Sequence, residues 1–373
     1  MIYLDHAAST SINSKAYDVL INFLREDFAN PQAAHLPGRN LQKKIEDCRK
    51  YFLSTLKADK GLCIFTSSAT ESNNMVISGW EGKSRENFFY SPSDHPSITI
   101  PCEKKKDLMA KKIPLSSGDI KTNALLDSID DKTRLVILTH INSVNGKINP
   151  VFEIAKLIKE KNSSIWIHLD AVQSYGKYPV CTEHMDSVSI SSHKIGGPKG
   201  IAGLYMKSHP PFNPLLWGGG QEKGWRASTP ATSLIFSFTE ACRQIFKNMQ
   251  KNKDHVQKLN EFTKNQLERI PKIRFPFNDT SSYILSFILP GISSDILLRQ
   301  LEQKNIFLSS TSACSSRIKG KNPVLSALGL EEALHKFVLR ISFSPQNTQE
   351  EIKIFSEELK KLYEQNYKIF KKK

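Results

Sequence analysis

The stretch SVSISSHKIGGPKGIAGLYM, residues 187–206, decides how the chain is read because it joins two strand-like runs through an unusual turn. The first run, SVSISS, consists of small and β-branched residues, as is typical of a buried strand. It ends in His193 and Lys194 before a turn rich in glycine and proline, and IAGLYM then predicts a second strand. A lysine here either extends its ammonium group to solvent or loses hydration, which lowers its pKa and makes it a better nucleophile. The stretch alone leaves both interpretations open.

Further short apolar runs alternate with helical or loop segments between about residue 60 and residue 206. They are LCIFTSS at 62–68, NFFYSP at 87–92, RLVILTHIN at 134–142 and SIWIHLD at 164–170. Several are continuous rather than alternating, as expected for strands that helices cover on both faces of a parallel sheet. The sequence therefore predicts an α/β fold, with a large domain whose mainly parallel sheet is covered by helices.

The pattern changes after about residue 246, where a long charged helical stretch leads into a second unit. That unit contains strand-like runs at 281–289 and 338–344, with a helical run between them at 293–305. Thr348 and Glu351 form a capping box that predicts the start of a final helix. We therefore expect a large α/β domain over 12–245 and a smaller α+β domain over 246–373. The N-terminal residues 1–11 are expected to belong to the smaller domain. Ligands are expected at the strand ends and in the crevice between the domains.

Composition places the chain among globular proteins that carry an excess of positive charge. Its 373 residues are 39% hydrophobic and 24% charged, with a net charge of +15. No apolar run approaches the length of about 20 residues that crosses a bilayer, and no signal peptide is visible, which predicts a cytoplasmic protein without membrane contact. The charge suggests nucleic acid as a partner, yet no zinc-finger spacing or RNA-recognition motif is present. A lysine-rich solvated surface explains the charge better, and a weak contact with tRNA or an acidic protein remains compatible with it.

The six cysteines form no C-x-x-C pair, so the sequence predicts neither a disulfide framework nor a metal site. Cys48, Cys63 and Cys242 lie in helical or strand patterns and are expected to be packing residues. Cys314 differs, because its neighbours in SSTSACSSRIKGKNP are small, polar and cationic. Nearby positive charge lowers the pKa of a thiol and favours the reactive thiolate.

Three further features bear on the role of Lys194. In FTSSATESNN, residues 65–74, the pattern predicts a strand followed by a helix that begins at Ala69 and Thr70. Free backbone N–H groups at the start of a helix suit a phosphate, although a simple capping motif has the same pattern. Asp170 ends an apolar strand and needs a partner such as a protonated ring nitrogen, unless it caps a helix. His95 follows another strand. Together they supply an amine, a carboxylate, a phosphate cradle and an imidazole, the groups that a pyridoxal phosphate enzyme uses.

With these residues in place, the chain resembles the cysteine desulfurases of the class V aminotransferase group, which are pyridoxal phosphate enzymes of fold type I. The resemblance runs nearly from end to end. Its ordered matches are YLDHAAST, NPQAAHLPGR, FTSSATESNN, HPSI, THIN, HLDAVQSYGK, SSHKIGGPKG, GGGQEKGWRASTP, SACSS and LRISFS. Such a series is far more specific than any single motif.

The resemblance implies a set of residues around the cofactor. These are Ala69, Thr70, Ser191 and His193 at the phosphate, His95 on the ring face and in proton transfer, Asn142 near the ring substituents, Asp170 at the ring nitrogen, Gln173 at the phenolic oxygen and Lys194 in the covalent link. Thr229 resembles a residue that reaches the phosphate of the neighbouring subunit, which implies a homodimer. Arg340, with Asn142, would bind the substrate, because a guanidinium clamps a carboxylate through two hydrogen bonds.

The activity implied is the conversion of L-cysteine to L-alanine, with sulfur transferred to Cys314 as a persulfide and then to an acceptor protein. The cysteine loop is similar to that of the branch that supplies iron–sulfur scaffolds or tRNA thiolation enzymes. A selenocysteine lyase, or another class V lyase or transaminase, would use the same cofactor residues. A non-catalytic scaffold or nucleic-acid-binding protein on this fold is the alternative from another class.

Three residues depart from the family pattern. His6 stands in YLDHAAST where asparagine is usual, and Ser143 and Val144 replace an Asn-Glu pair after Asn142. None of them removes a catalytic group named above. We expect these replacements to affect substrate preference, the packing of the loop or the rate of the reaction.

Overall fold

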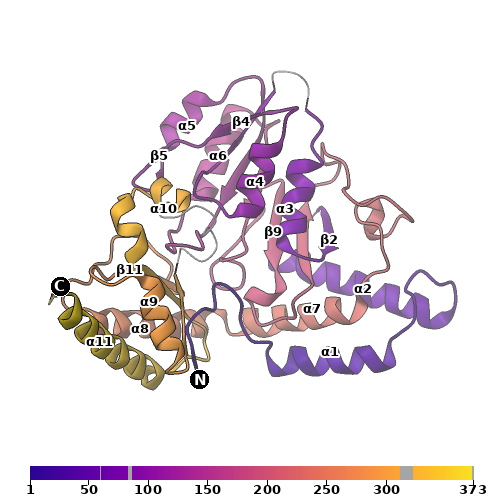
Figure 1. Cartoon of the computed structure of the whole chain (residues 1–373). Helices are drawn as coiled ribbons and strands as arrows, with labels where there is room; N and C mark the ends of the chain where they lie inside the picture. Colours follow the sequence, from indigo (N-terminus) through magenta and orange to yellow (C-terminus); the bar gives the residue numbers. More distant parts are fainter. Residues whose placement is uncertain (59, 83–85, 311–321, 372–373) are drawn as a thin grey trace.

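The computed structural model describes residues 1–58, 60–82, 86–310 and 322–371, with the backbone alone described over 367–371 (Figure 1). Its centre is a seven-stranded sheet in the order β2-β10-β9-β8-β7-β3-β4. The strands are β2 (Leu62–Thr66), β10 (Ala202–Met206), β9 (Ser187–Ser191), β8 (Trp166–Asp170), β7 (Thr133–Thr139), β3 (Asn87–Tyr90) and β4 (Met109–Lys112). Strand β10 pairs antiparallel with β2 and β9, and the other neighbouring pairs are parallel. The predicted mainly parallel sheet is confirmed.

Helices cover both faces of this sheet, which explains why its strands are apolar throughout (Figure 1). Successive side chains of a strand point to opposite faces. Val136 and Leu138 of β7 accordingly belong to one core, whereas Leu135 and Ile137 of the same strand belong to another. The first core packs against α2 (Leu36–Thr55), α6 (Val151–Lys161) and α7 (Thr232–Lys247). The second packs against α3 (Ala69–Ser78) and α4 (Pro96–Lys104).

Shorter elements complete the large unit. Helix α1 (Ser14–Glu26) packs against α7. The hairpin of β5 (Leu115–Ser116) and β6 (Asp119–Ile120) precedes α5 (Thr122–Ser128). Two 3₁₀ turns follow in the chain, η1 (Ser192–Lys194) after β9 and η2 (Glu222–Gly224) after β10.

The C-terminal unit has its own antiparallel sheet in the order β11-β14-β13 and its own hydrophobic core. The strands are β11 (Ile284–Ile288), β13 (Ser309–Ser310) and β14 (Val338–Ser342), and the helices are α8 (Met249–Leu267), α9 (Ser294–Glu302), α10 (Pro323–Ala327) and α11 (Gln349–Lys371), with η3 (Glu332–Phe337) before β14. Strand β1 (Ile2–Tyr3) pairs in parallel with β12 (Ile306–Phe307). The smaller α+β unit is thus confirmed, whereas the boundary between residues 245 and 246 stays a prediction; that position falls inside α7.

The predicted capping box forms at the start of α11. The Glu351 backbone N–H donates to Thr348 Oγ1 at 3.2 Å, and the Thr348 N–H donates to Glu351 Oε2 at 3.0 Å. Ile352, Phe355 and Leu359 of this helix are fully buried in the C-terminal core. The cap therefore fixes where the helix begins, and the apolar spacing fixes which face packs.

Candidate active site

The predicted site residues gather where the parallel strands of the large sheet end. Asp170 is the last residue of β8, and Ser191 is the last residue of β9. His95 follows β3 and caps α4, while Lys194 ends the turn η1 that follows β9. Because the carboxyl ends of parallel strands lie along one edge of a sheet, these segments meet there although they are far apart in sequence.

The N-terminal segment lies against Lys194. The Lys194 ammonium donates to the backbone carbonyls of Ala7 and Ala8, at 2.6 and 2.7 Å from Nζ. Gln173 Nε2 also donates to the Ala7 carbonyl, at 2.9 Å. The same segment is tied down by the Thr10 N–H, which donates to the His193 carbonyl at 3.0 Å. Residues 7–10 therefore position the amine that the sequence predicts to be reactive.

Asp170 is a buried carboxylate, only 6% exposed, that is held by neutral donors. Its Oδ1 accepts from the Val172 N–H at 2.9 Å, and its Oδ2 accepts from Asn73 Nδ2 at 3.1 Å. No ion pair joins it to a lysine or arginine within the residues described. A buried negative charge of this kind is stabilised by a cation placed against it, which a protonated pyridine nitrogen provides.

Asn73 connects Asp170 to His95 through Ser97. Besides Asp170, Asn73 Nδ2 donates to Ser97 Oγ at 2.9 Å, and Ser97 Oγ lies 2.8 Å from His95 Nδ1. The Ser97 backbone N–H also donates to His95 Nδ1, at 3.1 Å. Since a backbone N–H can only donate, Nδ1 is an acceptor, and the proton of the neutral imidazole lies on Nε2. Burial lowers the pKa of His95, the nearby Asp170 charge opposes this and the Lys194 charge adds to it.

The candidate phosphate residues lie around the start of α3 and the turn after β9. Ser68 caps α3 by accepting from the Glu71 N–H at 3.2 Å, and the exposed Thr70 lines an open pocket together with His95. His193 Nδ1 lies 3.2 Å from Ser9 Oγ. Its pKa is lowered to about 4, mainly by burial and then by the charges of Lys194, Lys199 and Lys177.

Two buried polar atoms beside these residues have no hydrogen-bond partner in the described structure, Gln173 Oε1 and Ser192 Oγ. Such atoms are rare in native proteins and indicate an absent ligand or water. Together with the unpaired charge of Asp170, they fit a phosphorylated pyridine aldehyde. The residues present are therefore suited to hold pyridoxal phosphate.

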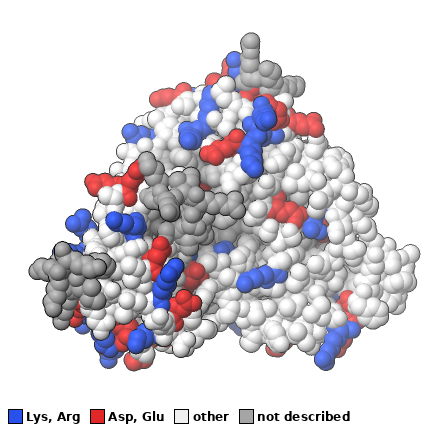
Figure 2. Space-filling model, viewed as in Figure 1, with Lys and Arg blue, Asp and Glu red and all other residues white. Residues whose placement is uncertain are grey.

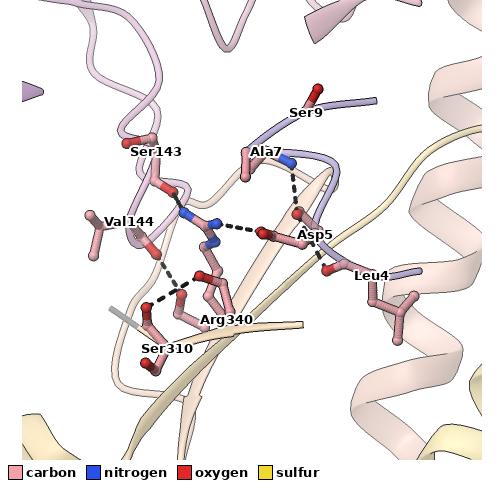
Figure 3. A network of polar contacts seen from close by, with 12 residues as sticks. Leu4, Asp5, Ala7, Ser9, Ser143, Val144, Ser310 and Arg340 are labelled. Atoms are coloured by element: carbon pink, nitrogen blue, oxygen red, sulfur yellow. Dashed lines mark hydrogen bonds and ion pairs between the residues drawn. The ribbon is translucent and has the colours of Figure 1, made fainter. Parts of the chain in front are cut away.

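Arg340 lies on β14 beside the N-terminal segment (Figure 3). Its Nη2 is 2.5 Å from Asp5 Oδ1, and its Nη1 donates to the Ser143 carbonyl at 2.8 Å. Its Nε is buried without a partner in the described structure. The guanidinium is thus held in one orientation and keeps a donor for a further acceptor such as a carboxylate.

The loop that contains Asn142 supports this arrangement mainly through its backbone. Asn142 Oδ1 accepts from the Val144 and Asn145 N–H groups at 2.8 and 3.3 Å, and its Nδ2 donates to the Ser93 carbonyl at 2.8 Å. The Val144 carbonyl accepts from Ser286 Oγ at 2.6 Å. Ser143 and Val144 therefore make these contacts through atoms that any residue has, which explains how the chain departs from the family pattern there.

The third departure, His6, lies near the same segment. Its Nδ1 is 3.1 Å from Thr10 Oγ1, and its ring packs edge-on against Tyr3 with the ring centroids 4.9 Å apart. Burial, followed by the charge of Lys177, lowers its pKa to about 4. His6 is therefore neutral at physiological pH and acts as a packed polar group.

Among the predicted residues that the structure describes, Thr229 is not joined to the cluster. Thr229 is exposed in the segment after η2, and no contact joins it to the other candidates within the described residues. That segment is nevertheless anchored next to α3, because Arg226 Nε lies 2.8 Å from Glu71 Oε1. Cys314 lies outside the described residues.

Sequence reasoning missed Asn73, Ser97 and the carbonyl of Ala7. Asn73 has a detectable signal, because it lies three residues after Thr70 and residues with that spacing share one face of a helix. Ser97 lies two residues after His95, where it completes the cap of α4. No side-chain pattern identifies the Ala7 carbonyl, since every residue has one.

Comparisons with known proteins show the family to which the chain belongs. The family model for class V aminotransferases matches residues 2–355. The chain is 34% identical over 366 residues to the mitochondrial cysteine desulfurase of Candida albicans, a match that covers 94% of this chain and 74% of that protein. It is 31% identical over 381 residues to the NifS/IcsS protein homolog of Lactobacillus delbrueckii subsp. bulgaricus, covering 99% of each.

Solved structures are similar as well. A NifS-like protein superposes with a TM-score of 0.90 at 28% identity and covers 97% of this chain and 98% of its own. A structure of SspA in complex with cysteine has a TM-score of 0.82 at 27% identity and covers 93% of this chain and 100% of its own. Fold and site together define a pyridoxal phosphate enzyme with an α/β large domain. The chain belongs to the class V aminotransferase family, within the group of cysteine desulfurases.

Proposed function

We propose that the chain converts L-cysteine to L-alanine and leaves the sulfur on Cys314 as a persulfide. The observation that carries this proposal is the position of Lys194, Asp170 and His95 at one edge of the sheet, with Arg340 held nearby by Asp5. Overall, the carbon–sulfur bond of cysteine breaks, a sulfur–sulfur bond forms on Cys314, and the Cys314 thiol proton balances the hydrogen gained by alanine. Pyridoxal phosphate, when bound, supplies the electron sink for this chemistry.

We assign the protein groups as follows. Lys194 Nζ holds the cofactor and, once released, takes the proton from the substrate Cα. Asp170 keeps the ring nitrogen protonated, because its buried charge has no other cation beside it in the described structure. Ala69, Thr70, Ser191 and His193 bind the phosphate, and Gln173 binds the phenolic oxygen. Asn142 shapes the loop that presents the Ser143 carbonyl to Arg340.

We assign His95 to the face of the ring, where its Nε2–H would donate a hydrogen bond. Because Nδ1 accepts from both the backbone N–H and the hydroxyl of Ser97, the neutral imidazole has its proton on Nε2 and donates there. In this neutral state Nε2–H acts as a hydrogen-bond donor, whereas proton release to a leaving group would need the imidazolium, which carries a proton on each nitrogen.

The decisive experiment is Cys314→Ala. We expect this variant to keep the visible absorption of the bound cofactor and to lose the formation of alanine and persulfide from cysteine. Cys181→Ala is the matched control, because Cys181 is half-buried whereas the other free cysteines of the described residues are buried. If the Cys314→Ala enzyme produced alanine at the wild-type rate, the assigned nucleophile would be wrong. Activity with selenocysteine but not cysteine in the wild type would favour the selenocysteine lyase alternative.

We further propose a homodimer in which Thr229 reaches the phosphate site of the partner subunit. A set of exposed, large apolar side chains supports the dimer. Leu24 lies on α1 and Phe28 on the loop after it, Leu36 lies at the start of α2, and Trp217 lies in the segment before η2. Phe28 is 87% exposed and Trp217 is 75% exposed, and patches of this kind mark interaction sites. Gln221 Nε2 donates to Gln32 Oε1 at 2.6 Å and so links two parts of this surface. Light scattering should give the mass of two chains, and Phe28→Asp should give one.

The proposals for the sulfur acceptor and for the cellular location are based on the sequence. We propose that a protein acceptor for iron–sulfur assembly or tRNA thiolation takes the persulfide sulfur, and that the enzyme is cytoplasmic. No helix among the described residues combines the length and the apolar character needed to cross a membrane. On the face seen in Figure 2, basic and acidic side chains are interspersed, as expected for a solvated surface, and the weak nucleic-acid contact stays a prediction.

A further inference from the structure

A cavity of about 190 Å³ lies next to Lys194, between the end of the large sheet and the C-terminal unit. The residues of its wall that matter here are His6, Lys177, Lys194, Asn252 and Tyr283. Of the residues assigned to the cofactor and the substrate, Lys194 lines it, whereas Asp170, His95 and Arg340 do not. The Lys194 ammonium itself is directed to the Ala7 and Ala8 carbonyls.

Lys177 is the most unusual group of this cavity. Lys177 is only 6% exposed. Within the described residues, no hydrogen-bond acceptor or carboxylate contacts its ammonium group. What faces Nζ is the ring of Tyr283, with the centroid 5.4 Å away. Leaving a buried ammonium with a cation–π contact alone is costly, because it loses hydration without gaining a counter-charge. Burial and then the Lys194 charge lower the pKa of Lys177 to about 7.

Two further observations point to the same kind of ligand. Tyr283 lines the cavity, and its buried hydroxyl has no partner in the described structure, so a second donor beside the cavity lacks an acceptor. No aspartate or glutamate belongs to the cavity wall in the part of the chain that is described. Lys177 and Lys194 thus place positive charge at the cavity, and no carboxylate of the described wall balances it.

We propose that this cavity binds a small carboxylate anion. One carboxylate oxygen accepts from the Lys177 ammonium and the other from the Tyr283 hydroxyl, which satisfies both buried donors at once. The cavity is large enough for an organic anion of several heavy atoms. Bound there, the anion places a negative charge next to the two lysines.

The test is thermal unfolding of the holoenzyme in sodium acetate compared with sodium chloride, at equal ionic strength and neutral pH. A ligand that binds the native state stabilises it in proportion to the logarithm of its concentration, so acetate should raise the Tm progressively. Lys177→Met should need about tenfold more acetate for the same rise, since a charged hydrogen bond is lost. Tyr283→Phe should weaken the response in the same direction. Lys156→Met, which alters an exposed lysine of α6, should respond like the wild type.

Three results would overturn the proposal: no acetate response in the wild type, an equal response to chloride, or an unchanged response in Lys177→Met. Loss of folding is not expected to obscure the test, because methionine replaces a buried, unpaired charge with an apolar side chain of similar length. Crystals of the holoenzyme grown in acetate give the second measurement. They should show density for the anion within hydrogen-bond distance of Lys177 Nζ, and density for water alone would contradict the proposal.

Discussion

At the scale of single residues, the site depends on contacts that fix proton positions. Asn73 donates to both Asp170 and Ser97, and Ser97 in turn donates to His95 Nδ1. Asn73 Oδ1 also lies 3.0 Å from Nε2 of His168, which is fully buried and whose pKa is lowered to about 3 by burial. The chain His168–Asn73–Ser97–His95 therefore orients each member without requiring any of them to be charged.

The first prediction concerns Ser97→Ala, which removes the hydroxyl but keeps the backbone N–H that caps α4. We expect kcat to fall about tenfold with little change in KM, because His95 loses one of the two donors that hold its proton on Nε2. Hydrogen–deuterium exchange at the His95 ring carbon, followed by mass spectrometry, should show a raised imidazole pKa in the same variant. Thr99→Ala on the same helix is the control. An unchanged pKa of His95 would refute the proposed positioning role of Ser97.

The second prediction concerns Asp94, a buried carboxyl whose pKa is raised from 3.8 to about 7, mainly by burial. The protonated form is favoured in the folded state, so its contribution to stability is complete below the unfolded pKa and is lost as the pH rises toward 7. Asp94→Asn mimics the neutral form and can still accept from the Ser91 N–H, which lies 2.9 Å from Asp94 Oδ2. Relative to the wild type, the free energy of unfolding of the variant should increase by about 1 to 3 kcal/mol between pH 4 and pH 7. Above pH 7 the difference should level off.

Urea unfolding across this pH range measures that difference. Histidines whose pKa is lowered by burial, such as His140 and His168, contribute equally to both proteins and cancel. A difference in unfolding free energy that stays constant from pH 4 to pH 8 would show that Asp94 ionises normally in the folded state.

At the scale of elements, the sequence predicts strands and helices well where burial alone sets the pattern. The continuous runs at 134–142 and 164–170 became β7 and β8 because helices cover both sides of the sheet. The sequence does not reveal that β10 runs antiparallel to its neighbours, since an apolar strand has the same composition in either direction. It also placed the end of the strand containing β7 at Asn142, whereas β7 ends at Thr139 and Asn142 instead forms a turn with its side chain.

In the candidate site as well, some residues are predictable from a local pattern and others are not. Lys194, Asp170 and His95 are visible from sequence because a polar residue at the end of an apolar strand is conspicuous. The Ala7 carbonyl, the Asp5–Arg340 pair and the unpartnered Lys177 depend on which segments meet in space. No local pattern contains that information.

The third prediction tests the capping box of α11. Thr348→Ala removes the hydroxyl that accepts from the Glu351 N–H and should destabilise the protein by about 1 kcal/mol in urea unfolding. Thr348→Ser keeps the hydroxyl and should restore most of this free energy. If the alanine and serine variants unfolded alike, the cap would contribute nothing measurable to the C-terminal unit.

At the scale of the whole molecule, the N-terminal segment connects the two units around the site. Residues 2–3 pair with β12 of the C-terminal unit, and the Ala7 N–H donates to Ser342 Oγ of β14 at 2.8 Å. The carbonyl of the same Ala7 accepts from Lys194 and Gln173 of the large unit. The same short segment therefore contacts both units and the amine of Lys194.

The fourth prediction follows from the pair of Asp5 and Arg340, which joins residues 335 positions apart in the chain. Asp5→Asn should raise the KM for L-cysteine about tenfold and change kcat little, because a charge-assisted contact that orients the guanidinium is weakened. Asp18→Asn, on the exposed side of α1, should behave like the wild type. A lower KM in Asp5→Asn would mean that Asp5 competes with the substrate carboxylate for Arg340. In that case the N-terminal segment would restrain substrate binding instead of preparing the site for it.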